Sequence, residues 1–298
     1  KMGARTGNTT AFFVVQPGPL SLQARLLVAS LRRFAPFPLR LTACHPVGSG
    51  ALSDDTRTFF EAADVTITSF QPRLWPTYDY PIGNKLAASL IPFDTPYAVF
   101  LDSDMLAVRP FRFWPLKDAE VAACPIFGKQ CFRAEHRPAL EAFVAQHGLN
   151  IALGPERLHR NRSSIGVPVY NSGLVFFRTD IGFPKIWAEL TENVLRSRLP
   201  GALQRPFADQ TALALLVAQK RFAFSEADRS FNQILTRNYA KAKIIHYFRN
   251  PDLMTHPETL RLVSDLQKDW AAQGVSLLGG IAEKDLFAFR RLTESLAR

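Results

Sequence analysis

Two aspartates, Asp102 and Asp104, directly follow an apolar run and are separated by one serine. The run covers residues 97–101, reads YAVFL and is typical of a buried strand. Carboxylates at the end of such a strand are costly unless a partner balances their charge. Two neighbouring carboxylates also raise each other's proton affinity unless a cation lies between them. The pair therefore predicts a divalent ion, and oxygen ligands suit Mg²⁺ or Mn²⁺.

The spacing of Asp102 and Asp104 leaves three interpretations open. On an extended backbone both side chains would point the same way and could hold one ion, which usually also binds substrate phosphates. The pair could instead form a plain turn, with Asp102 accepting from backbone N–H groups and Asp104 in solvent. Haloacid-dehalogenase-type phosphatases also have Asp-x-Asp after an apolar strand. Against that class, three predicted strands precede the motif and Met105 and Leu106 follow it.

Strands and helices alternate through the first half of the chain. Expected strands cover residues 11–16, 39–44, 64–70, 97–101 and 119–126, and expected helices cover 21–34, 54–63 and 83–91. This alternation predicts an α/β fold with a mainly parallel sheet covered by helices on both faces. Ligands of such sheets bind beyond the carboxyl ends of the strands, where Asp102 and Asp104 would lie. Asp54 is expected to cap its helix.

The second half is more mixed. It predicts helices over 137–147, 186–198 and 209–220, strands over 170–178 and 243–248, and an exposed loop over 154–168. Four apolar residues recur at helical spacing beyond residue 257 and predict a stripe packed on the core: Leu260, Val263, Leu266 and Trp270. The expected organisation is a polar tail over 1–10, one domain over 11–256 and a helical C-terminal extension over 257–298.

Composition narrows the function classes. The 298 residues are 47% hydrophobic and 21% charged, as in an ordinary globular protein, and no stretch is apolar enough to span a bilayer. The net charge of +10 favours anionic partners and is compatible with peripheral contact with an anionic membrane. Nucleic acid is disfavoured, because no dense Lys/Arg tract or nucleic-acid-binding signature is present. Cys44, Cys124 and Cys131 are expected to be reduced thiols, which suggests a cytoplasmic protein.

Four ordered stretches resemble the nucleotide-sugar glycosyltransferases of the A-type fold, most of all family eight, which includes glycogenin and bacterial lipopolysaccharide galactosyltransferases. They are Asn84-Lys85-Leu86, Asp102-Ser103-Asp104, Tyr170-Asn171-Ser172-Gly173, and Asp209-Gln210 followed by Ile245-His246-Tyr247. The resemblance covers about residues 11–250 and implies a single A-type domain with a Rossmann-like sheet. It also implies a metal-dependent transfer of a hexose from a nucleotide sugar, UDP-sugar being favoured. The acceptor would be a hydroxyl group of a glycan, of a lipid-linked acceptor or of a small molecule. The anomeric configuration would be retained.

The resemblance implies a role for each matching residue. Asp102, Asp104 and His246 would bind Mn²⁺ or Mg²⁺. Lys85 and Arg249 would contact the diphosphate, and Lys85 could reach the donor sugar. Gln16 and Pro17 would bind the base and ribose of the donor, and Asn171 and Ser172 would bind the sugar hydroxyls. Ser103 is a further donor-binding candidate. Asp209 and Gln210 would lie near the reacting carbon, and Asp79, Tyr80 or Arg25 could assist.

Local explanations remain open for the same residues. A lone histidine such as His246 is more often a satisfied core residue, and Lys85 could be solvated in a first helical turn. Asn-Ser-Gly is good turn chemistry by itself, and Asp209 could cap a helix. The family usually has a glycine and a lysine after its histidine, whereas this chain reads HYFRNP. A glycosyltransferase-like protein that binds a partner without turnover is therefore a further hypothesis.

Overall fold

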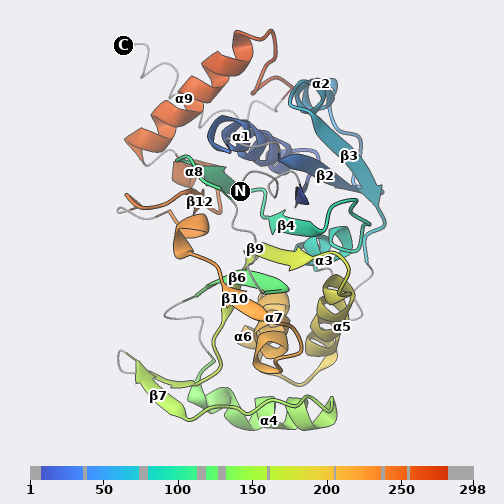
Figure 1. Cartoon of the computed structure of the whole chain (residues 1–298), viewed down its shortest axis with the longest axis vertical. Helices are drawn as coiled ribbons and strands as arrows, with labels where there is room; N and C mark the ends of the chain where they lie inside the picture. The colour runs from blue at the N-terminus through green and yellow to red at the C-terminus, as the bar shows by residue number, and fades with distance from the viewer. Residues whose placement is uncertain are drawn as a thin grey trace, which may run out of the picture.

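The computed structural model describes residues 8–35, 39–73, 80–112, 119–126, 132–159, 162–204, 206–235, 239–253 and 256–280. Its main sheet has seven strands in the order β10-β6-β9-β4-β1-β2-β3 (Figure 1). The strands are β1 (Thr9–Val14), β2 (Arg40–Pro46), β3 (Val65–Phe70), β4 (Tyr97–Leu101), β6 (Val121–Pro125), β9 (Tyr170–Arg178) and β10 (Phe224–Glu226). Strand β9 runs antiparallel to β4 and β6, and the other pairs are parallel. The predicted α/β fold with a mainly parallel mixed sheet is confirmed.

Helices cover both faces of this sheet (Figure 1). One face carries α1 (Pro19–Phe34) and α2 (Asp54–Ala62), and the other carries α3 (Asn84–Ala88), α5 (Phe183–Arg196) and α7 (Ala208–Ala218). Alternate residues of β1 enter the two cores: Ala11 and Phe13 pack on the α1 side, and Phe12 packs on the α3 side. Burial on both faces explains why the β1 sequence is continuously apolar.

A three-stranded second sheet brings the distant histidine to the aspartates. It consists of β5 (Met105–Ala107), β11 (Gln233–Ile234) and β12 (Ile244–His246), in the order β11-β12-β5. Strand β12 is antiparallel to β5, so His246 pairs with Met105, the residue after Asp104. The pairing continues beyond β12, because the Tyr247 N–H donates to the Asp104 carbonyl oxygen at 3.1 Å.

Several local predictions were wrong. The expected loop over 154–168 contains a hairpin of β7 (Glu156–His159) and β8 (Arg162–Ile165), whose polar sequence lacks apolar alternation. Helix α2 is capped by Ser53, which accepts from the Thr56 N–H at 3.3 Å, while Asp54 lies in the first turn. Asp209 lies in the first turn of α7, whose N-cap position is Phe207. The expected polar tail over 1–10 overlaps β1, and residues 1–7 lie outside the described part.

The remaining helices include the start of the expected C-terminal extension. They are α4 (Arg137–Gln146), α6 (Gly201–Gln204), α8 (Asn250–Leu253) and α9 (Pro257–Ala271). Helix α9 packs against α1 (Figure 1) and buries Val263, Leu266 and Trp270, whereas Leu260 is only partly buried. The Trp270 ring lies 4.8 Å from that of Phe59. Residues 281–298 are outside the described part, and the domain boundaries stay predictions.

Among the described helices, none has the length and hydropathy needed to cross a membrane. Cys44 and Cys124 are free and buried, and burial raises the pKa of both thiols. Cys131 lies outside the described residues.

The packing of α9 can be tested by truncating its largest buried side chain. Trp270→Ala should lower the free energy of unfolding by about 3 kcal/mol, since it removes buried apolar surface and leaves a cavity. Urea denaturation measures this change. Lys268→Ala, at an exposed position of the same helix, is the control and should change stability by less than about 0.5 kcal/mol. Equal effects of the two substitutions would contradict the packing of α9 on the core.

Candidate active site

A pocket of about 420 Å³ opens at the carboxyl edge of the main sheet. Its walls come from the ends of β1, β4 and β12 and from the beginnings of β9, α3 and α7, so segments far apart in sequence meet there. Its polar lining consists of Gln16, Gln23, Asn84, Lys85, Asp102, Ser103, Asp104, Asn171, Asp209, Gln210 and His246. The structure thus brings most of the sequence-predicted site residues into one cavity.

Asp102, Asp104 and His246 form a cluster with the geometry of a metal site. One ligand atom from each residue can be chosen so that all three atoms lie within 4.8 Å of one another. His246 Nε2 lies 3.0 Å from Asp104 Oδ1 and 3.8 Å from Asp102 Oδ2. The aspartates converge for a reason other than the one expected from an extended strand. They sit in a turn between β4 and β5, in which the Met105 N–H donates to the Asp102 carbonyl oxygen at 3.2 Å.

Asn232 contacts the imidazole of His246 at Nδ1, the ring nitrogen that faces away from Asp104. Asn232 Oδ1 lies 3.1 Å from His246 Nδ1 and can accept an N–H from it, which would leave the Nε2 lone pair for a cation held with the carboxylates. Asn232 Nδ2 in turn donates to Asn171 Oδ1 at 2.9 Å. Partners of this kind fix the tautomer and orientation of metal-binding histidines. Sequence reasoning missed Asn232, because a single asparagine outside any motif carries no signal.

Lys85 is buried among acidic groups, which rules out the solvated alternative. It is only 7% exposed, and its Nζ lies 3.2 Å from Asp102 Oδ1, 3.3 Å from Asp209 Oδ2 and 3.1 Å from Ser172 Oγ. Burial alone would lower the pKa of Lys85, but the two carboxylates outweigh burial and raise it above its ordinary value. The ammonium group is therefore a fixed positive charge in the pocket.

Asp209 is ordered by hydrogen bonds to both of its carboxylate oxygens. The Tyr80 hydroxyl donates to Oδ1 at 2.8 Å, and the Ser172 hydroxyl donates to Oδ2 at 2.5 Å. The Trp187 indole N–H also donates to the Asp209 backbone carbonyl at 2.8 Å. These contacts fix the first turn of α7 and thereby the following residue, Gln210. Within the described part of the chain, the Gln210 amide has no hydrogen-bond partner although it lines the pocket.

The charges of the cluster favour a cation. Burial raises the pKa of Asp102, and the neighbouring Asp104 raises it further against the opposing effects of Lys85 and His246. Burial would lower the pKa of His246, but Asp104 outweighs burial and raises it. Asp104 thus raises the pKa of both of its neighbours in the cluster. Two carboxylates and one imidazole nitrogen are suitable ligands for a divalent cation.

Gly173 provides the space in which this cluster assembles. A Cβ at this position would lie 2.7 Å from Asp102 Oδ2, 2.8 Å from Asn171 Oδ1 and 2.8 Å from His246 Cε1. Such contacts are too short for any side chain, so the Asn-Ser-Gly stretch needs its glycine for close approach as well as for turn chemistry.

Other predicted residues occupy different positions. Ser103 lines the pocket, but its hydroxyl donates to the Val14 carbonyl and ties the aspartate turn to β1. Pro17 is exposed and does not line the pocket. The Arg249 side chain is 78% exposed and pairs with Asp252 at 3.2 Å, outside the lining. Arg25 is buried in α1 and donates to the Gly279 carbonyl at 2.8 Å, away from the pocket.

Phe248 adopts a backbone conformation that usually requires glycine. Its φ is 61°, and the Arg249 N–H donates to the Tyr247 carbonyl at 2.7 Å, which closes a γ-turn around Phe248. For a bulky residue this conformation costs on the order of 1–3 kcal/mol. The family resemblance implies a glycine after His246. This chain adopts a glycine-like turn there without the glycine.

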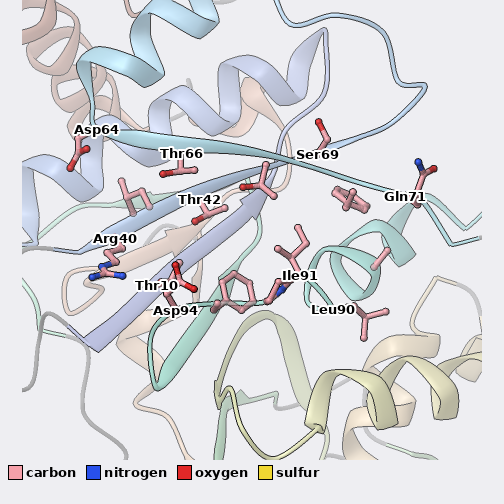
Figure 2. Close-up of a pocket in the computed structure, with 16 residues that line it drawn as sticks. Thr10, Arg40, Thr42, Asp64, Thr66, Ser69, Gln71, Leu90, Ile91 and Asp94 are labelled. Atoms are coloured by element: carbon pink, nitrogen blue, oxygen red, sulfur yellow. The ribbon is translucent and has the colours of Figure 1, made fainter.

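A second hollow, of about 630 Å³, lies beyond α3 on the open face of β2 and β3 (Figure 2). Thr42 and Thr66 lie on its floor, and Leu90 and Ile91 face them from the end of α3. The described residues that line it include no cluster of His, Cys, Asp or Glu able to hold a metal. The smaller pocket is therefore the candidate active site, because it concentrates the charged groups.

Residues 11–221 match a Rhodobacterales glycosyltransferase domain, well over half of the chain. The match ends before Asn232 and His246, so the position of these two residues in the site rests on the structure and not on this match. No curated protein matches the sequence significantly.

Three solved structures with a similar fold are distant from this chain in sequence. They include the galactosyltransferase LgtC in complex with donor and acceptor sugar analogues, with 14% identity, a TM-score of 0.51 and coverage of 87% of this chain and 95% of LgtC. An active-site mutant of LgtC matches with 13% identity, a TM-score of 0.52 and the same coverages. The glycosyltransferase GlyE of Streptococcus pneumoniae TIGR4 matches with 12% identity, a TM-score of 0.51 and coverage of 90% of this chain and 65% of GlyE. The chain belongs to the Rhodobacterales glycosyltransferase domain family, and it is a glycosyltransferase with the A-type fold.

Proposed function

We propose that this glycosyltransferase moves a hexose from a nucleotide-diphosphate sugar to a hydroxyl group of a glycan, a lipid-linked or a small-molecule acceptor. The observation that carries the proposal is the Asp102, Asp104 and His246 cluster inside the pocket of a glycosyltransferase domain. The family assignment favours this reaction over the phosphatase alternative, which shared only the Asp-x-Asp pattern.

Asp102, Asp104 and His246 would hold Mn²⁺ or Mg²⁺. When bound, the ion would stabilise the negative charge that develops on the diphosphate as the bond to the sugar breaks. Asn232 supports this role by keeping the proton of His246 on Nδ1 and its Nε2 free. Gly173 supports it by leaving room for the carboxylate of Asp102 and the imidazole.

Lys85 and Gln210 would also act on the donor. The Lys85 ammonium group, oriented by Asp102 and Asp209, would stabilise the same developing charge without reorganising. The free amide of Gln210 would hydrogen-bond the donor sugar, and Asp209 would orient both groups. The acceptor oxygen then bonds to the anomeric carbon, the electron pair of the broken bond leaves with the diphosphate, and the hydroxyl proton is released. Retention of configuration rests on the resemblance to family eight.

Gln16, Leu20 and Gln23 would hold the base and ribose at the junction of β1 and α1. Gln23 is buried and its amide has no partner among the described residues, so it adds a recognition group that sequence reasoning missed. A uracil base is favoured by the resemblance. Contact between Arg249 and the diphosphate would require Arg249 to leave Asp252.

Thermal unfolding with UDP, GDP, CDP, ADP and TDP, each with and without Mn²⁺, tests the proposal. A ligand that binds only the folded state raises its apparent stability. We expect one nucleotide to raise the Tm, and only in the presence of Mn²⁺. No shift with any nucleotide would contradict the proposal and favour a binding protein without turnover.

Asp104→Ala should abolish the Mn²⁺-dependent Tm shift and reduce donor turnover at least about 100-fold, because it removes a proposed direct ligand of the ion. Loss of a residue that only supports a metal ligand already costs about 10–100-fold. The fold should persist, since the Asp104 side chain lies in a turn and is partly exposed. Release of the nucleotide from the identified donor measures turnover, and Asp94→Ala, at an exposed position outside the pocket, is the matched control. Undiminished turnover in Asp104→Ala would remove the basis of the metal site.

Gly173→Ala tests whether the close approach at β9 matters. The added methyl group should displace Asp102 and His246 and raise the Mn²⁺ concentration for a half-maximal Tm shift at least about tenfold. Gly201→Ala is the matched control, because a Cβ there meets no atom within 4 Å. Wild-type Mn²⁺ dependence in Gly173→Ala would show that the cluster does not bind the ion in this geometry.

A further inference from the structure

The candidate active site has one apolar edge that its polar chemistry does not use. Four large hydrophobic residues of the described chain are strongly exposed, and two of them, Ile234 and Phe248, line this pocket. Ile234 is 41% exposed and pairs with His246 in the second sheet, and Phe248 is 46% exposed and follows His246 by two residues. Both therefore belong to the wall that carries the histidine. Single exposed hydrophobics are common, but two at the mouth of one polar pocket indicate a contact surface.

Phe248 is held in place from two directions. Its ring packs on the imidazole of His246, with the centroids 4.3 Å apart and the planes inclined by 33°. Its backbone lies in a γ-turn that is fixed on one side by the hydrogen bond from Tyr247 N–H to the Asp104 carbonyl. An aromatic side chain that is rigid and half exposed loses little entropy when a ligand covers it.

The strained backbone argues that this side chain is kept for function. Glycine adopts a φ of 61° without strain, and asparagine does so more easily than phenylalanine. Strain of this kind gathers at ligand-binding positions, where the surrounding structure maintains it. A residue that served only the turn would not need a phenyl ring.

We propose that Phe248, together with Ile234, forms the acceptor wall of this enzyme and packs against the carbon-bound hydrogen face of a sugar ring. The proposal rests on the proposed function and extends it to the acceptor. The charged groups Lys85, Asp102 and Asp209 lie at the inner side of the pocket, and Gln16 and Gln23 lie at its β1 end. The exposed apolar edge remains for the group that enters from solvent, which is the acceptor.

A different role for Phe248 would be to cover His246, which is 3% exposed, and protect the metal site from water. That role predicts altered Mn²⁺ dependence without a change in acceptor recognition. The two roles are therefore separable by measuring Mn²⁺ dependence and acceptor KM on the same variants.

The test uses Phe248→Gly, Phe248→Asn and Phe248→Tyr in the full chain, with the donor found in the nucleotide experiment. Acceptors are p-nitrophenyl glucopyranoside, galactopyranoside and mannopyranoside, and hydrolysis of the donor by water is the reference reaction. Val47→Ala is the matched control, since Val47 is 47% exposed but does not line the pocket. Thermal unfolding without ligand reports the strain, and the Mn²⁺ titration reports the metal site.

Phe248→Gly and Phe248→Asn should raise the acceptor KM at least about tenfold, the loss expected when an aromatic contact surface is removed. Their Tm should equal or exceed that of the wild type, because the strain is relieved. Phe248→Tyr should restore the wild-type KM, and Val47→Ala should change nothing.

An acceptor KM that changes less than threefold in Phe248→Gly and Phe248→Asn overturns the proposal, whether or not the Mn²⁺ dependence shifts. Wild-type protein that hydrolyses the donor but glycosylates none of the three hexosides also counts against a sugar-binding wall. Wild-type protein with neither nucleotide binding nor donor turnover would instead show that the proposed function has failed.

Discussion

The structure depends on an unbalanced group of charges at the carboxyl edge of its sheet. Asp102, Asp104 and Asp209 bring three carboxylates to one pocket, where Lys85 supplies one ammonium group. With His246 neutral, two negative charges remain, the charge that a divalent cation offsets. Burial and Asp104 raise the pKa of Asp102, and Asp104 raises that of His246.

The register of the strand pairs determines which residues meet in this pocket. His246 reaches Asp104 because β12 pairs with β5 in one particular antiparallel register, in which His246 faces Met105. Gly173 reaches Asp102 because β9 pairs with β4 so that Leu174 faces Leu101. A slip of one residue in the β12–β5 pairing would turn the His246 side chain to the opposite face of its sheet, and a slip in the β9–β4 pairing would move Gly173 away from Asp102. The apolar cores on both faces fix the register, and the core thereby determines the positions of the charges.

The sequence predicted the groups that carry charge better than the groups that orient them. Asp102 and Asp104 could be found because two carboxylates follow a buried strand, and His246 because the family resemblance places a histidine with them. Of the backbone geometries left open for the aspartate pair, the structure has the turn. Asn232 could not be found, because its role appears only when β11 and β12 pair. The β7–β8 hairpin was missed for a similar reason: backbone pairing holds it, and its polar sequence has no apolar period.

Local preference and structure disagree at several residues of the site. Lys85 is buried although lysine favours solvent, Gly173 sits inside a strand although glycine weakens strands, and Phe248 takes a left-handed conformation that phenylalanine avoids. Each of these residues has a neighbour in the Asp102, Asp104 and His246 cluster: Asp102 for Lys85 and Gly173, and His246 for Phe248. Exceptions of this kind are expected in a functional site, because function there outweighs the stability that better-suited residues would add.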